Sequence, residues 1–347
     1  MKWKLEGKVY RERMKLMRLK RFLLLSIAFL LIATTALTGC NNEKAKNAVA
    51  KVNGEIISKT ELEDYVNYQK KSAEMTQNIA PDMWDTDAGG GKTYEDQLRE
   101  MALEELITQE ILIQKAEKKG IEVTDEELNK EIEKLKGSEE DIKNFNDYLE
   151  KLGINEEYFK SIYKKGMVIS KLMDESIEIS DNEAKEYYMR TRDKFDKVRA
   201  RHILVKTEKE AKEIKDKLDN GSDFIELAKE KSTGPSAPNG GDLGYFTKGR
   251  MLPEFEETAF NLKEGEVSKP VKTQYGYHII KVEDKKVTLE DNKEEVKDDL
   301  KNNKFTENVK KYREEAEVEK LIDFDKEAKD KSEENKKENK KEDNKEE

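Results

Sequence analysis

Apolar residues recur with a helical period along most of residues 48–196. The segment LREMALEELITQEILIQKAEKKG carries a broad apolar stripe and ends at Gly120, a residue type that commonly terminates helices. Ser58, Thr124 and Ser180 each precede a glutamate by three residues, which is the spacing of a capping box at a helix start. We therefore predict that residues 48–196 are mostly α-helical.

The pattern changes at Val198, where VRARHILV alternates as a strand does, with Ala200, His202 and Leu204 on one face. Thr207 begins another capping box. Further helices are expected at 207–221, 222–231 and 253–261, and further strands at 244–246, 266–272 and 277–283. This order, β-α-α-β-α-β-β, predicts a compact α+β domain over residues 197–287.

A helical pattern returns over residues 288–323, but its apolar positions are too sparse for it to fold alone. We expect these C-terminal helices to pack on the N-terminal helical region. From Asp325 to Glu347, Ala328 is the only apolar residue. The last segment, 324–347, is therefore predicted to be a disordered charged tail.

The first 39 residues have the pattern of an export signal. A basic segment precedes the apolar stretch Phe22–Leu37, which is short for a membrane span, and LTGC follows at once. This LTGC resembles a bacterial lipobox, and the resemblance implies cleavage before Cys40 and lipidation of its sulfur. An uncleaved anchor with an incidental cysteine is the alternative. Residues 40–47 would then tether the chain to the cell membrane, on its extracytoplasmic side.

Charge and cysteine content narrow the range of functions. Charged residues make up 41% of the chain, and the net charge is −10. Without the first 39 residues, which carry nine basic and two acidic side chains, the net charge becomes −17. Such an acidic body repels phosphate backbones, so we expect no nucleic-acid partner. A single cysteine excludes an intramolecular disulfide and any cysteine-rich metal site.

One stretch differs in composition from the rest of the chain. STGPSAPNGGDLGYF, residues 232–246, contains four glycines, two prolines and only one charged residue. Four of the five prolines and both histidines of the chain lie between residues 202 and 278. Tight backbone turns and imidazole groups are thus concentrated in the predicted α+β domain, so we expect the functional site in this domain.

RARHILVK, GGDLGYF and GRMLPEFEETAFNLKEGEVSKPVKTQYGYHIIKV resemble the core of a parvulin-type peptidyl-prolyl isomerase. With a lipobox ahead and helices on both sides, the whole chain is similar to the PrsA foldase lipoproteins. The resemblance implies a four-stranded antiparallel sheet with surrounding helices. This domain would be inserted between N- and C-terminal helical segments that form a chaperone-like domain.

The resemblance also assigns site residues. His202 and His278 correspond to a pair of histidines that lie side by side beneath the parvulin site and bond to a threonine, here Thr273. Their implied role is orientation and local electrostatics. Two satisfied core histidines are the alternative. Many parvulins carry Cys or Asp in the loop before GGDLG, and here that position falls on Thr233 or Gly234, neither of which ionises.

Leu243, Met251 and Phe255 correspond to the pocket that holds the substrate proline, with ordinary core packing as the alternative. Isomerisation of an X-Pro bond needs no covalent step, because a pocket that prefers the twisted amide lowers the barrier. We therefore expect neither a cofactor nor a metal ion.

The sequence therefore predicts a membrane-anchored isomerase and foldase. Its partners would be unfolded exported polypeptides with X-Pro bonds, and a homodimer is left open. A holdase chaperone with a weakly active or inactive parvulin domain is the alternative, and the missing Cys or Asp favours it.

Overall fold

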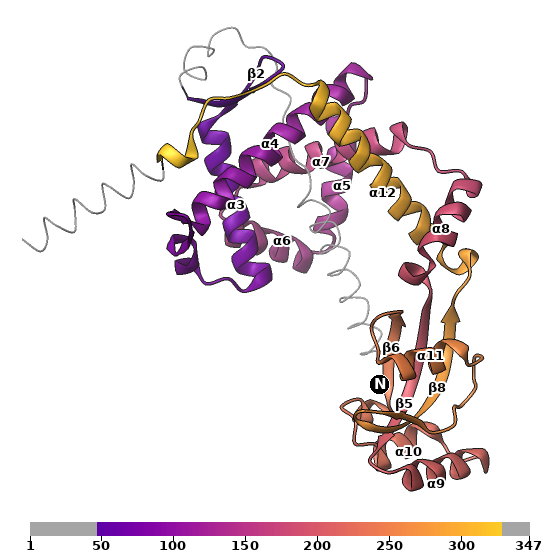
Figure 1. Ribbon diagram of the computed structural model, residues 1–347. Helices are drawn as coiled ribbons and strands as arrows, with labels where there is room; N and C mark the ends of the chain where they lie inside the picture. The colour runs from indigo at the N-terminus through magenta and orange to yellow at the C-terminus, as the bar shows by residue number, and fades with distance from the viewer. Residues whose placement is uncertain (1–46, 328–347) are drawn as a thin grey trace, which may run out of the picture. The chain divides into compact units, whose positions relative to one another are not determined.

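A computed structural model describes residues 47–327 and divides them into two compact units (Figure 1). The first unit comprises residues 47–177 and 305–327, and the second comprises residues 178–304. The isomerase-like domain predicted from the sequence, residues 197–287, lies inside the second unit. That these residues fold independently stays a prediction. Cys40 and the rest of the predicted signal and tether up to residue 46 lie outside the described residues.

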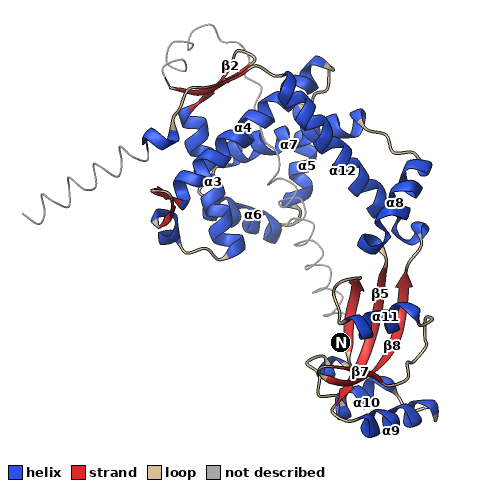
Figure 2. Cartoon of the chain, in the orientation of Figure 1, coloured by secondary structure: helices blue, strands red, loops and turns tan. Residues whose placement is uncertain are grey.

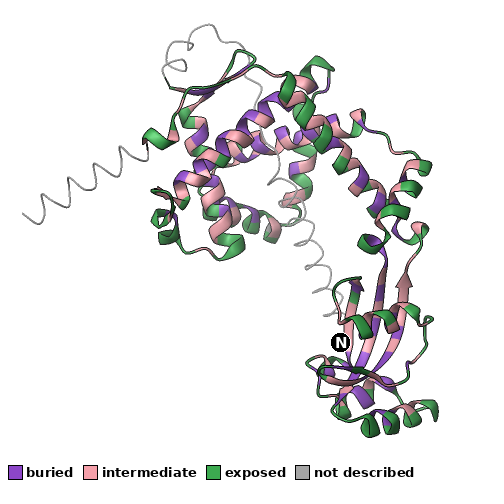
Figure 3. Cartoon of the chain, viewed as in Figure 1, coloured by how far each residue is buried: buried purple, intermediate pink, exposed green. Residues whose placement is uncertain are grey.

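The first unit is mainly helical. Its helices are α3 (Lys59–Gln77), α4 (Tyr94–Lys118), α5 (Asp125–Lys136), α6 (Glu139–Leu152) and α7 (Glu156–Ser176), with a short 3-10 turn at Pro81–Asp85. The apolar stripe predicted from the sequence is the buried face of α4, and buried residues recur along the helices of this unit (Figure 3). In α4, Leu103, Ile107 and Leu112 are almost inaccessible to solvent. The predicted capping box at Thr124 and Glu127 is confirmed at the start of α5.

Small sheets complete the first unit. β1 (Ala48–Val52) lies between β2 (Glu55–Ser58) and β9 (Val318–Lys320), and β3 (Asp87–Gly89) pairs with β4 (Lys92–Thr93). The expectation of helix throughout 288–323 is wrong at β9. The reason is tertiary, because Leu321 donates a backbone hydrogen bond to Val49 and the backbone N–H of Asn53 bonds the carbonyl of Glu317. Pairing with β1 thus outweighs the local helical preference of this segment.

The second unit is built on a four-stranded antiparallel sheet in the order β6-β5-β8-β7 (Figure 2). The strands are β5 (Lys197–Val205), β6 (Asp242–Thr247), β7 (Val271–Thr273) and β8 (Gly276–Lys286). This confirms the α+β fold and the antiparallel sheet. The long strand β5 is central, and its alternation buries one set of residues on each face of the sheet.

Both faces of the sheet are covered. α9 (Glu208–Asp219) and α10 (Phe224–Lys231) pack on one face, where Ile203 and Ile279 are fully buried. α11 (Pro253–Asn261) covers the other face, and its Phe255 packs with Val198 and Ile280. The β5 pattern, with apolar residues on both faces, agrees with this two-sided burial.

Two further helices belong partly or wholly to this unit. α8 (Asp181–Phe195) packs on the first part of α12 (Leu289–Glu315), with Tyr188 and Phe195 buried against Val296. The division between the units falls inside α12, after Lys304. Of the helices in the described residues, none has the length and apolar character to cross a membrane.

Candidate active site

The two histidines lie side by side on neighbouring strands. β5 and β8 pair so that His202 is opposite Ile280 and His278 is opposite Leu204, which places both imidazoles on the α11 face of the sheet. The rings stack with centroids 5.2 Å apart, and the two Nδ1 atoms are 3.0 Å apart. Only 7% of His202 and 5% of His278 is exposed. The sequence-predicted pair is thus a buried unit.

A hydroxyl group closes each end of the histidine pair. His278 Nε2 lies 2.9 Å from Thr273 Oγ1, and His202 Nε2 lies 3.0 Å from Ser236 Oγ. Thr273 Oγ1 also accepts a hydrogen bond from the backbone N–H of Tyr275. The four side chains form one continuous chain of hydrogen bonds, Thr273–His278–His202–Ser236, in which two neutral rings satisfy every contact. Either hydroxyl can end the chain with a free O–H.

Burial keeps these rings neutral. Desolvation, helped by the neighbouring His278, lowers the pKa of His202 from 6.5 to about 4, and desolvation also lowers the pKa of His278. A neutral imidazole pair in an apolar setting can fix the orientation of the hydroxyls at its ends. It is poorly placed for nucleophilic attack, because all four ring nitrogens already have partners.

These pKa shifts make stability depend on pH. Between pH 6.5 and 4 the unfolded His202 binds a proton that the folded one does not, so stability falls as the pH is lowered through this window. The expected slope is about 1.4 kcal/mol per pH unit for each histidine affected. Urea unfolding of residues 41–347 across this range should show the loss, and His202→Gln should reduce it. Equal slopes for both proteins would show that His202 does not carry the effect.

An aromatic ring closes the site from the helix side. Phe255 on α11 meets both imidazoles edge-on, with its centroid 5.7 Å from that of His202 and 5.3 Å from that of His278. Leu243 and Met251 are half-buried and pack in the same cluster, although Met251 precedes α11. Phe255 therefore lies beside the histidine pair, and Leu243 and Met251 belong to the same apolar cluster as Phe255.

The glycine-rich loop is held tightly against β5. The backbone carbonyl of Gly241 accepts a hydrogen bond from His202 N–H, and Asp242 pairs with Arg199 and Arg201. The hydrogen bond from Arg199 holds the pKa of the Asp242 carboxyl below its usual value. Asp242, which follows Gly240 and Gly241, thus ties the loop to β5.

The loop also separates the two candidates for the Cys or Asp position. Thr233 donates its hydroxyl to the carbonyl of Leu204 and its side chain is exposed. Gly234 is buried, and a Cβ added there would lie 3.2 Å from His202 Nε2. Its φ is outside the left-handed region, so the backbone conformation suits a side chain, and the His202 ring would have to move by a few tenths of an ångström to make room for it. Gly234, and not Thr233, therefore lies next to the histidine pair.

Ser236 is expected from the sequence only as an alternative to Thr233 for a hydroxyl that hydrogen-bonds the substrate, and its contact with the histidine pair is not predicted. Its only sequence signal is a hydroxyl in the glycine- and proline-rich loop, and serines are common in loops for other reasons. Its contact with His202 depends on the turn at Ser236–Gly241, which folds the loop back on β5. Among residues 47–327 there is no cluster of three or more His, Cys, Asp or Glu side chains that could hold a metal ion.

Comparison with known proteins agrees with this architecture. The model of a PPIC-type PPIase domain matches residues 187–286, and that of a SurA-like N-terminal domain matches residues 10–173. The foldase protein PrsA of Caldanaerobacter subterraneus subsp. tengcongensis is 39% identical over 271 residues, covering 77% of this chain and 83% of the relative. That of Geobacillus kaustophilus is 38% identical over 285 residues, covering 80% and 86%.

Solved structures include similar proteins. A crystal structure of peptidylprolyl isomerase PrsA from Bacillus cereus is 30% identical and covers 81% of this chain and 96% of that one, with a TM-score of 0.33. PrsA from Bacillus subtilis is 31% identical, with coverage of 78% and 91% and a TM-score of 0.27.

The family models and the two curated relatives define a peptidyl-prolyl cis–trans isomerase of the parvulin type, carried by a chain with a chaperone-like helical region. Such a protein acts outside the cytoplasm as a foldase for exported polypeptides. The chain belongs to the PrsA foldase family.

Proposed function

We propose that the surface formed by Leu243, Met251 and Phe255 holds the substrate proline, and that the histidine pair supports this surface from below. Rotation about an X-Pro amide faces a barrier of about 18–20 kcal/mol, because it breaks the resonance of the amide. An apolar pocket favours the twisted, less polar amide over the planar one. The edge-on contact of Phe255 with both buried imidazoles is the observation that carries this proposal.

In this proposal His202, His278 and Thr273 position groups and exchange no proton with the substrate. The hydrogen-bond chain holds Ser236 Oγ at the loop end of the pair, 3.0 Å from His202 Nε2. When the chain runs from Thr273 toward Ser236, the Ser236 O–H is free to donate to the carbonyl of the rotating amide. We assign Thr233 to holding the loop on β5, since its hydroxyl bonds Leu204.

Gly234 would occupy the position where many parvulins have Cys or Asp. We expect Gly234→Cys to raise kcat/KM several-fold, because a thiol there would face His202 and the substrate carbonyl. Protease-coupled assay of a short proline peptide measures this. Gly234→Ala is the matched control, since it fills the same space without a polar group. Thr233→Asp should give no gain. A Cys variant no faster than the Ala variant would show that the missing group matters little.

A holdase with a weak isomerase domain is the second candidate, and the absence of an ionisable group at Gly234 is what favours it. The refolding yield of a client protein, measured with residues 41–347 of the wild type and of Phe255→Ala, separates the two. A foldase that depends on isomerisation loses refolding yield in the variant, and a pure holdase keeps it. Sedimentation of the same protein tests whether the chain forms the homodimer that the sequence leaves open.

We further propose that Cys40, which lies outside the described residues, is the lipid attachment site that anchors the chain on the extracytoplasmic side of the membrane. Its support is the LTGC sequence after a basic and then apolar segment. Two acyl chains on one residue would anchor the chain stably. Cys40→Ala should abolish incorporation of a labelled fatty acid and leave the signal segment uncleaved. Label that persists on the variant would exclude Cys40 as the acceptor.

A further inference from the structure

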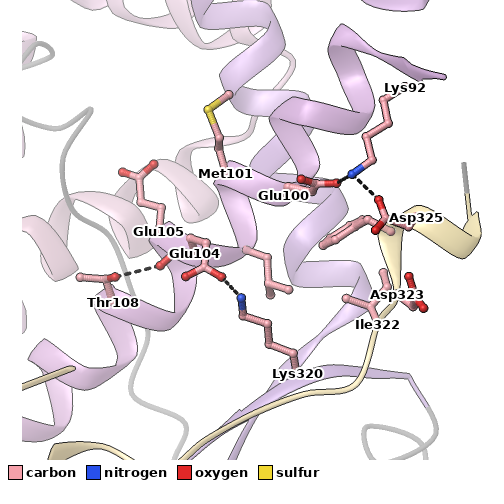
Figure 4. Close-up of a pocket in the computed structure, with 12 residues that line it drawn as sticks. Lys92, Glu100, Met101, Glu104, Glu105, Thr108, Lys320, Ile322, Asp323 and Asp325 are labelled. Atoms are coloured by element: carbon pink, nitrogen blue, oxygen red, sulfur yellow. Dashed lines mark hydrogen bonds and ion pairs between the residues drawn. The ribbon is translucent and has the colours of Figure 1, made fainter. Parts of the chain in front are cut away.

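The helical unit contains a groove that the isomerase chemistry does not use. It lies between α4 and residues 320–325 and has a volume of about 920 Å³ (Figure 4). Met101, Leu103, Ile322 and Phe324 give it apolar surface. Met101 is 62% exposed, which is unusual for a large apolar side chain and leaves its thioether open to a partner.

The polar part of the lining is acidic. Five carboxylates line the groove against two ammonium groups, and the carboxylates belong to Glu100, Glu104, Glu105, Asp323 and Asp325. Both lysines are already neutralised within the protein, because Lys92 pairs with Glu100 and Asp325, and Lys320 pairs with Glu104 (Figure 4). Arg313 also pairs with Glu104, so the negative field that meets an incoming segment comes mainly from Glu105 and Asp323.

One of these carboxylates has an incomplete set of partners. Glu105 Oε1 is inaccessible to solvent and has no hydrogen-bond partner, and its other oxygen lies 3.5 Å from Gln69 Nε2. Burial raises the pKa of this carboxyl to about 7. Interactions with Tyr65 and Gln109 offset part of this rise, and a cationic side chain in the groove would stabilise the ionised carboxylate further.

The C-terminal wall of the groove is fixed in place. Arg99 on α4 pairs with Glu327 at 2.8 Å and lies over the ring of Phe324 at 5.6 Å. β9 holds the preceding residues to β1. The groove is thus formed before a partner binds, so binding carries no conformational-entropy cost for ordering it.

We propose that this groove binds an extended segment of an unfolded client polypeptide in which apolar side chains stand next to lysine or arginine. Apolar side chains would bury Met101 and Phe324, and the cation would meet the acidic lining. The inference rests on the foldase function, for which it names a client-binding surface outside the isomerase domain.

The first test uses a fluorescent proline-free peptide of Leu, Phe and Lys, and a second peptide with Glu in place of Lys. Fluorescence anisotropy with residues 41–347 should show binding of the first and little of the second. Met101→Gln should weaken binding of the Lys peptide about tenfold, since it removes one apolar contact. Met189→Gln is the matched control, because Met189 is 63% exposed on a helix of the other unit.

The second test concerns charge. Glu105→Gln should weaken binding of the Lys peptide and lower its sensitivity to salt, whereas Glu117→Gln on the exposed face of the same helix should change neither. Isomerase activity on a proline peptide should be unchanged in all four variants. This distinguishes failure of the groove proposal from failure of the isomerase site.

Three results would overturn the proposal. Equal affinity for the Lys and Glu peptides would show that the acidic lining does not select the peptide. Equal effects of Met101→Gln and Met189→Gln would show that the peptide does not bind in this groove. A change in sedimentation with Met101→Gln, without a change in peptide affinity, would assign the groove to contact between two copies of the chain.

Discussion

Phe255→Ala should lower kcat/KM for a proline peptide by about 10- to 100-fold, since it removes the ring expected to grip proline and about 1.5–3 kcal/mol of apolar contact. The same ring closes the histidine pair on the helix side. Met251→Ala, at a half-buried position, should cause a smaller loss in the same direction.

Stability has to be measured beside the rate, because Phe255 is 3% exposed and its truncation leaves a core cavity. Phe255→Leu retains most of the buried volume and gives a better-folded comparison. Phe260→Ala is the matched control, since Phe260 lies on the same helix and its ring packs on Phe246. Full activity of a folded Phe255→Ala protein would contradict the proline pocket.

Gly241→Ala should prevent the isomerase domain from folding stably. Gly241 has a φ of +76°, and a Cβ there would collide with the carbonyl oxygen of His202 on the central strand. Backbone cannot move aside as a flexible side chain can, so we expect a loss above about 4 kcal/mol, in the exceptional range for a single substitution. Isomerase activity should disappear with the fold.

Gly244→Ala is the comparison that distinguishes the collision at Gly241 from the strain of a positive φ, which both positions share. Gly244 has a φ of +67° and nothing lies within 4 Å of an added Cβ, so the variant bears only the strain of a left-handed alanine, about 1–2 kcal/mol. Hydrogen exchange of peptides from β5 and β8 in residues 41–347 reports both effects. Similar protection in the two variants would show that position 241 does not need glycine to avoid a collision with the backbone of His202.

The sequence allowed most of the isomerase domain to be predicted, because its local signals agree with its tertiary structure. Alternation in VRARHILV and the capping box at Thr207 lie where β5 and α9 form. The helix expected from Pro253 is α11. Each of these elements is specified by residues in the element itself or next to it in the sequence.

What the sequence did not show depends on contacts between distant residues. β9 has three residues and forms only because β1 offers its edge, and Lys51 pairs with Glu319 across 268 positions of sequence. The sequence offers the Ser236 hydroxyl as a hydrogen-bond partner of the substrate but not its contact with His202, because the loop must fold back before the hydroxyl reaches that ring. Whether Thr233 or Gly234 faces the histidines likewise depends on distant contacts, because the backbone N–H and the hydroxyl of Thr233 both donate to the carbonyl of Leu204.

The central claim is that Phe255 and the neutral histidine pair form a surface that accelerates rotation about an X-Pro bond. NMR exchange spectroscopy of a proline peptide measures this rotation directly, without a coupling protease. We expect catalytic amounts of residues 41–347 to produce cis–trans exchange peaks, Phe260→Ala to retain them, and a folded Phe255→Leu protein to weaken them strongly. Exchange that is equally fast with Phe255→Leu and Phe260→Ala would contradict the account.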